Sequence, residues 1–113
     1  FLTFRAAGKA QHLVLGLRNF GLEETAARVG GQTLLKDPAW RQTLVTALGN
    51  PSARFTVSVE GLAGTSVYSK IMGAVTRPGA SATNWELSQL AQAGRLGEVR
   101  FVDRAGNLLP NPF

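Results

Sequence analysis

The chain contains no cysteine among its 113 residues. This absence excludes disulfide bonds and thiolate metal sites, and it allows folding in either an oxidising or a reducing compartment. No apolar run approaches the ~20 residues that a membrane span needs, and no basic leader precedes a short apolar block. We therefore expect no stable insertion into a membrane.

Signatures of metal and cofactor chemistry are also missing. The sequence has no cluster of His, Cys, Asp and Glu at metal-ligand spacing, and the H-E-x-x-H, G-x-S-x-G and dinucleotide-binding patterns do not occur. A metal-dependent nuclease, which would need several carboxylates, is disfavoured. We predict a protein that uses neither a metal ion nor a cofactor.

Acidic residues are few. Seven Asp and Glu stand against twelve Lys and Arg, which gives a net charge of +5 and an isoelectric point near 10.8. Such a charge predicts an anionic partner, whether nucleic acid, an anionic membrane surface or an acidic protein.

The length and the 44% hydrophobic content predict one domain over residues 1–113. Because residue 1 is Phe and the single methionine is Met72, we expect this domain to be a C-terminal fragment of a longer protein.

The hydrophobic spacing predicts helices in the first half of the chain and strands later. Helices are expected over about residues 4–20 and 22–29, after Asp37 and Pro38, over residues 66–75 with Thr65 or Ser66 as cap, and from a capping box of Thr83 and Glu86 to Gly94. The alternation of residues 54–60 predicts a half-buried strand, with Phe55, Val57 and Val59 inside. Residues 98–102 and 107–109 read as a hairpin. The fold expected is α+β, with N-terminal helices packed on a small antiparallel sheet.

His12 is the single histidine, so any imidazole acid–base step near neutral pH must use it. On a helix from Arg5 to Phe20, the residues within about 60° of His12 would include Arg5, Lys9, Gly16 and Asn19. A histidine among cations suits phosphodiester cleavage, since neutral imidazole can take the proton of a ribose 2′-hydroxyl while cations stabilise the phosphate. The alternative is an ordinary half-exposed helix residue beside solvated charges.

Other candidates have equally ordinary alternatives. Thr56 and Ser58 could donate from the polar face of their strand, which is also what any alternating strand looks like. The stretch GLAGTS could seat an anion at a helix start, although it fails the P-loop pattern and a helix cap explains it. Lys70 and Arg77 could contact phosphate, while a cation such as Arg77 after a helix also compensates the helix dipole.

Several segments together resemble the C-terminal toxin modules of contact-dependent inhibition and Rhs-type polymorphic toxins: HLVLGLR, EETAARVGG, DPAW, FTVSVEGLAG, SVYSKIMGAVTR, TNWELSQLAQAGRL and the terminal NPF. The resemblance implies secretion or cell-surface delivery by a producer cell, action in the cytoplasm of a competing cell, and neutralisation by a cognate immunity protein. Many such modules are ribonucleases, several with the fold shared by barnase, EndoU, colicin-type ribonucleases and RelE. The helices expected between residues 59 and 99 depart from that fold.

These observations predict a metal-independent toxin ribonuclease that acts on RNA, with tRNA favoured, and that binds an acidic immunity protein. His12, Lys9 and Thr56 are the expected catalytic residues, and the expected substrate-binding residues are Arg5, Arg77, Ser58 and Lys70. One alternative is an NAD-consuming toxin, a glycohydrolase or ADP-ribosyltransferase, that recruits Arg54, Ser58 and Glu86. Another is a non-catalytic module that binds through its basic surface.

Overall fold

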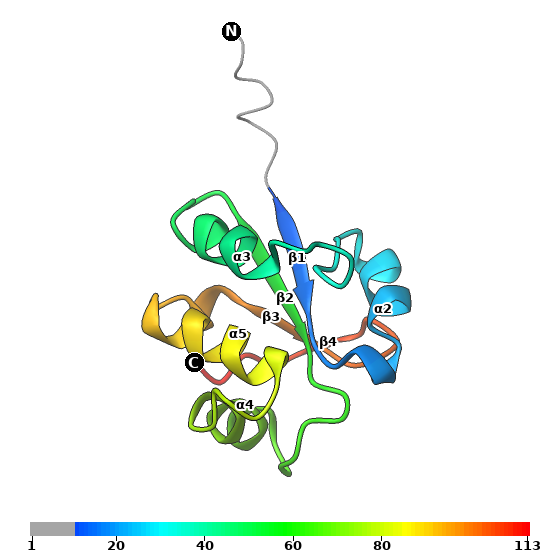
Figure 1. The fold of residues 1–113 in the computed structure, drawn as a ribbon. Coiled ribbons are helices and arrows are strands. Elements are labelled where there is room, and N and C mark those ends of the chain that lie inside the picture. Colours follow the sequence, from blue (N-terminus) through cyan, green and yellow to red (C-terminus); the bar gives the residue numbers. More distant parts are fainter. Residues whose placement is uncertain (1–10) are drawn as a thin grey trace, which may run out of the picture.

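A computed structural model describes residues 11–113 of the chain, and it places four helices around a four-stranded sheet (Figure 1). The predicted α+β class is confirmed. Helices are distributed along the described chain rather than confined to its N-terminal part. The elements in order are β1 (His12–Leu15), η1 (Arg18–Phe20), α2 (Leu22–Val29), α3 (Trp40–Leu48), β2 (Arg54–Ser58), α4 (Val67–Val75), α5 (Ala82–Gln92), η2 (Leu96–Glu98), β3 (Arg100–Val102) and β4 (Leu108–Leu109).

The sheet is mostly parallel, so the expectation of an antiparallel sheet is wrong. Its strand order is β1-β2-β3-β4, in which β1 pairs parallel with β2 and β2 pairs parallel with β3. The pair β3 and β4 is antiparallel, which confirms the predicted hairpin. Parallel neighbours need long crossover connections, and the helical segments between β1 and β2 and between β2 and β3 supply them.

The predicted helix over residues 4–20 is also wrong where the structure describes it, because residues His12–Leu15 form a strand. The run HLVL is too short for periodicity to distinguish a buried strand from a buried helix. Pairing with β2 decides the matter, and Leu13, Val14 and Leu15 are all at most 1% exposed. His12 is therefore a strand residue, and the helical face expected around it does not form among residues 12–20, the part of it that the structure describes.

The sheet is covered on both faces (Figure 1). Helices α3, α4 and α5 pack on the face that carries Phe55, Val57 and Phe101, and together they form the main core. Helix α2 packs on the opposite face through Leu22 and Ala26. The turn between β3 and β4 adjoins α2, since the Thr25 hydroxyl donates to the Arg104 carbonyl at 2.8 Å.

Because both faces of the sheet are covered, β2 is buried on both of its faces and not on one alone. Phe55, Val57 and Val59 are buried as predicted, but Thr56 and Ser58 are only 1% and 2% exposed. The prediction of a solvent-facing polar row is therefore wrong, because β2 is a central strand with layers on both sides.

Local capping explains where the later helices begin. Ser66 caps α4 and exchanges hydrogen bonds with Ser69 in a capping box, which confirms the helix-cap interpretation of the GLAGTS loop. Helix α5 is capped by Ser81, two residues before the predicted Thr83. Thr83 instead donates its hydroxyl to the Gly16 carbonyl at 2.7 Å, which ties α5 to the end of β1.

Arg95 joins the two crossover connections at one corner of the fold. Its side chain is buried, and its guanidinium lies 4.9 Å from the Phe55 ring centroid. It donates to Glu98 and to four backbone carbonyls, those of Ala47, Leu48, Asn50 and Ala53. These carbonyls lie at the end of α3 and in the loop before β2, where a buried polar group needs a partner.

Among residues 11–113, no helix combines the length and the apolar character that crossing a bilayer requires.

Candidate functional site

Three neighbouring strands bring a histidine, a threonine and two arginines to one face of the sheet. We call His12, Arg54, Thr56 and Arg100 the histidine cluster. His12 is the direct partner of Arg54 in the β1–β2 pairing, and Thr56 is the partner of Arg100 in the β2–β3 pairing. Paired residues project to the same side, and residues two apart share a face, so all four side chains leave the same side of the sheet.

A hydrogen bond with Thr56 holds the His12 ring in place on the sheet. His12 Nε2 lies 2.7 Å from Thr56 Oγ1, and the threonine is almost fully buried while His12 keeps part of its surface exposed. The Nδ1 edge of the ring faces the backbone after α2, where a Cβ placed on Gly31 would lie 3.0 Å from Nδ1. The imidazole fits here because Gly31 has no side chain; any larger residue would crowd the ring.

The surroundings of His12 favour its neutral form. Partial burial lowers its pKa below the ordinary 6.5, and the positive charges of Arg100 and Arg54 lower it further, against an opposing hydrogen bond with the Gly30 backbone. The imidazole is thus mainly uncharged at neutral pH. A neutral imidazole can accept a proton, which a general base requires.

The two arginines of the cluster are exposed and have no ion-pair partner among the described residues. A guanidinium donates two parallel hydrogen bonds to a phosphate and carries its charge at all accessible pH values. The cluster therefore combines a proton acceptor with two free anion-binding groups, and this combination suits attack on a phosphodiester.

The remaining predicted site residues lie elsewhere. Lys9 and Arg5 fall outside the described residues. Ser58 is buried on the cluster's face, too deep for substrate. Lys70 donates to the Leu62 carbonyl at 2.9 Å, and it lines with Arg77 a hollow of about 240 Å³ beside α4, across the sheet from His12.

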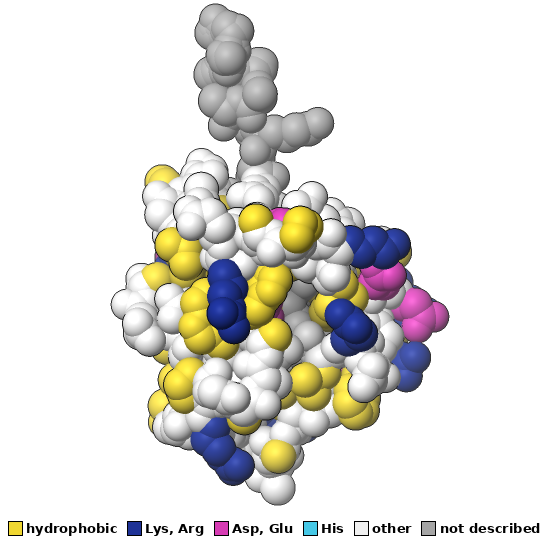
Figure 2. Space-filling view, in the orientation of Figure 1, with side chains coloured by type: hydrophobic (Ala, Val, Ile, Leu, Met, Phe, Trp, Pro, Cys, Tyr) yellow, Lys and Arg dark blue, Asp and Glu magenta, His cyan; other side chains and the backbone are white. Residues whose placement is uncertain are grey.

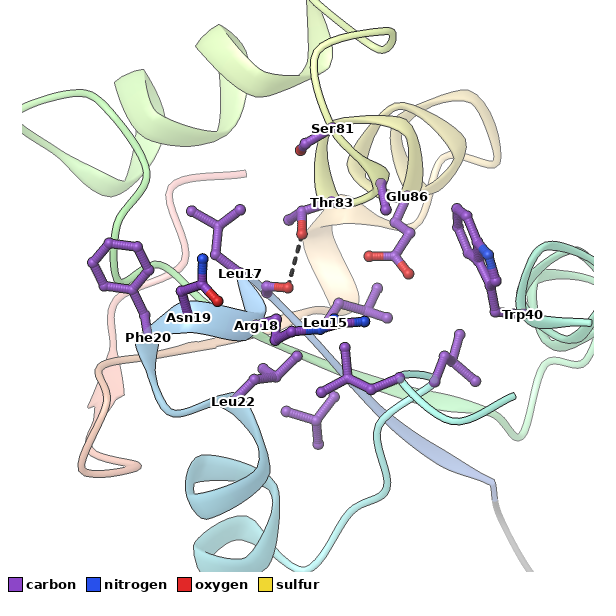
Figure 3. A pocket seen from close by; sticks show the side chains of 15 residues that line it. Leu15, Leu17, Arg18, Asn19, Phe20, Leu22, Trp40, Ser81, Thr83 and Glu86 are labelled. Carbon is purple, nitrogen blue, oxygen red and sulfur yellow. Dashed lines mark hydrogen bonds between the residues drawn. The ribbon is translucent and has the colours of Figure 1, made fainter. Parts of the chain in front are cut away.

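A larger cavity, of about 600 Å³, lies at the other end of β1. Figure 2 shows a hollow bordered by hydrophobic and basic side chains, with some acidic surface visible within it. The close-up in Figure 3 shows Glu86 of α5 and Arg18 of η1 directed into the pocket. Its walls come mainly from apolar residues that include Leu15, Leu22, Leu34 and Trp40.

Glu86 is the most perturbed acid of the described chain. It is 7% exposed, and burial raises its pKa to about 7 from an ordinary 4.5. The capping-box role predicted for it is wrong, because Ser81 caps the helix and Glu86 lies one turn further in. Neither Arg54 nor Ser58 lines this cavity, so the three residues expected for an NAD-consuming site do not line it together.

No family model, curated protein or solved structure matches this chain.

Within the described range, no three His, Asp or Glu residues lie close enough together to hold a metal ion.

Arg100 was not predicted from the sequence, and Glu86 was predicted only as a capping residue and for the NAD-consuming alternative. Each left a recoverable signal. Arg100 alternates with the buried Phe101 on its strand, but its place beside Thr56 depends on a strand register that the sequence does not reveal. Glu86 falls at the helical spacing of Thr83, Leu87 and Leu90, all of them buried. That spacing indicated burial of an acid, and burial of an acid marks a candidate site.

Proposed function

We propose that this chain is a toxin domain that cleaves RNA without a metal ion, with the histidine cluster as its active site. The observation that carries the proposal is the position of His12, which is hydrogen-bonded to Thr56, is paired with the exposed Arg54 on β2, and is close enough to Arg100 on β3 for both charges to lower its pKa. The net charge of +5 suits a polyanionic substrate. The resemblance to delivered toxin modules favours tRNA as the substrate, a competing cell's cytoplasm as the place of action, and an acidic immunity protein as the partner.

In the proposed reaction, the His12 side chain turns outward, so that Nε2 leaves Thr56 Oγ1 and accepts a hydrogen bond from the ribose 2′-hydroxyl. His12 takes the hydroxyl proton, and the 2′-oxygen attacks the adjacent phosphorus. The bond from phosphorus to the 5′-oxygen breaks, which leaves a 2′,3′-cyclic phosphate and a 5′-hydroxyl end. Arg54 and Arg100 stabilise the charge that develops on the phosphate oxygens.

Thr56 is a positioning residue in this scheme. Its hydroxyl is too buried to meet the substrate, but it holds the imidazole in one orientation before the substrate arrives. The proton that the 5′-oxygen needs returns from the imidazolium or from water.

The direct test is to incubate the purified domain with total RNA and with tRNA, in EDTA and in magnesium. We expect discrete fragments with 2′,3′-cyclic phosphate ends in both buffers. His12→Ala should reduce cleavage at least a hundredfold, whereas Arg77→Gln, across the sheet, should cleave normally. Equal activity of wild type and a folded His12→Ala variant would overturn the proposed mechanism, and intact RNA in every reaction would overturn the proposed function.

A further inference from the structure

The cavity at the end of β1 contains an acid without a partner. No hydrogen bond or ion pair joins the Glu86 carboxyl to another residue of the described chain, although the residue is 93% buried. A buried carboxylate without donors is costly, and a protein of marginal stability tolerates it when a ligand supplies the donors. Figure 3 shows this carboxyl directed into the cavity rather than into the protein.

The rest of the cavity indicates the shape of that ligand. A volume of about 600 Å³ lies within the range of small-molecule sites, roughly 300–1,000 Å³. Leucines and the Trp40 indole form most of the walls, so they fit a flat, largely apolar body. Glu86, deep inside, can accept two parallel N–H donors through its two oxygens.

The two charged side chains of the site, one acidic and one basic, favour a ligand that carries both N–H donors and a negative charge. Arg18 is exposed at the cavity and, apart from Glu86, is the only charged side chain among the described residues that line it. The chain as a whole carries +5, which repels cations and attracts anions. The ligand should therefore combine N–H donors at one end with negative charge at the other.

We infer that the cavity binds a guanine nucleotide, with the base edge on the Glu86 carboxylate and the phosphate beside Arg18. Guanine presents N1–H and its 2-amino group side by side, which matches two carboxylate oxygens. Adenine and cytosine instead place a ring-nitrogen acceptor next to their amino group, and uracil places its single N–H between two carbonyls. The inference does not depend on the proposed cleavage by His12, because nucleotide binding is a separate measurement.

The test measures binding of GMP, AMP, CMP, UMP and NAD by calorimetry at pH 8, where Glu86 is mainly ionised. We expect GMP to bind at least tenfold more tightly than each of the others. Glu86→Gln replaces one acceptor oxygen by a donor, so it should weaken GMP binding at least tenfold and favour AMP. Arg18→Gln should weaken GMP binding while leaving guanosine binding nearly unchanged.

Controls keep these outcomes interpretable. Glu60→Gln removes the same charge from a carboxylate outside the cavity, where Glu60 accepts the Arg104 backbone N–H, and it should leave GMP binding unchanged. Thermal unfolding confirms that each variant is folded. Tighter binding of AMP or NAD than of GMP, equal GMP affinity in wild type and folded Glu86→Gln, or no nucleotide binding at all would overturn the inference.

The nucleotide can be free or part of an RNA strand. A second binding experiment, with short RNAs, distinguishes these two possibilities. Short RNAs with one guanosine or none are titrated into His12→Ala, which should not cleave them. Stronger binding of the guanosine-containing RNA than of GMP identifies a strand nucleotide, and stronger binding of GMP identifies a free nucleotide. Both results support the guanine site, provided that Glu86→Gln abolishes the preference; if the preference survives that change, the site is wrong.

Discussion

His12 of β1 and Arg54 of β2 are direct partners across the parallel pair, and Arg100 extends the same face onto β3. This arrangement predicts separate roles for imidazole and guanidinium. Arg54→Gln and Arg100→Gln should each lower kcat/KM for RNA by about tenfold to a hundredfold, since each removes a donor to the charged phosphate. Each should also reduce the salt dependence of RNA binding, by about 0.7 in log–log slope for a single strand.

Arg77→Gln is the matched control for these variants. It removes one positive charge from the opposite side of the sheet and should change neither cleavage nor the salt slope appreciably. If all three variants behave alike, net charge rather than the cluster determines activity.

If the hydrogen bond with Thr56 positions the His12 ring for catalysis, its removal should lower activity. Thr56→Val keeps the shape but removes the hydroxyl, so kcat/KM should fall about fivefold, the equivalent of about 1 kcal/mol from one hydrogen bond. Thr56→Ser should restore most of the activity. A purely structural role for Thr56 would lower stability in Thr56→Val without any loss of kcat/KM in the folded enzyme.

The acid limb of the pH profile should report the state of His12. The base must be uncharged, and both burial and the two arginines hold the pKa of His12 below 6.5. The kcat/KM for RNA should therefore rise with pH and reach half of its plateau below pH 6.5. Arg54→Gln should move this midpoint upward, because it removes one of the charges that depress the pKa. A midpoint above 6.5 in wild type would contradict the assigned environment.

Close packing of Gly31 against the imidazole predicts that Gly31→Ala harms both stability and activity. An added Cβ would lie 2.5 Å from Val14 Cγ2 and 3.0 Å from His12 Nδ1, so β1 or the ring must shift. We expect a loss of about 1–3 kcal/mol in the free energy of unfolding, as for other overpacked sites. The comparison is Gly79→Ala, whose Cβ meets nothing within 4 Å, measured by urea denaturation.

Glu86 predicts an unusual dependence of stability on pH. Its pKa is about 7 in the folded chain and near 4.5 in the unfolded chain, so the folded state binds more protons between these values. The Glu86 contribution is fully present below pH 4.5, falls as pH rises to about 7, and is then lost, a change of about 3 kcal/mol. Glu86→Gln should therefore be more stable than wild type at pH 8 but similar at pH 4. Parallel stability curves for the two proteins would show that Glu86 ionises normally.

Local signals in the sequence predicted the elements that depend on local interactions. Helix α2 begins and ends as expected, with acids in its first turn and Gly30 in the left-handed conformation at its end. The β3–β4 hairpin also follows from its turn residues. The strand β1 could not be predicted in this way, because its partner β2 lies about 40 residues further along the chain, and its apolar run fits a helix equally well.

In the candidate site, too, local features could be predicted from the sequence, whereas contacts between distant segments could not. His12 stood out as the single histidine, but its neighbours depend on strand register rather than on helical spacing. The sequence therefore suggested Arg5 and Lys9, whereas the described structure places Arg54 on the neighbouring strand and Arg100 one strand further on the same face. Glu86 was interpreted as a capping residue because Thr83 and Glu86 match a capping box; Ser81 is the better cap because it leaves Thr83 free to reach Gly16.

The guanidinium of Arg95 has a consequence for how this domain can diverge. The stretches 50–53 and 95–98 meet at this one planar group, so neither stretch can change length without pulling a carbonyl or Glu98 away from it. An insertion between Asn50 and Ala53 should therefore be poorly tolerated, although both residues lie in a loop. The exposed turn around Gly79, which Arg95 does not reach and where an added Cβ would meet nothing within 4 Å, is where homologous chains should accept extra residues.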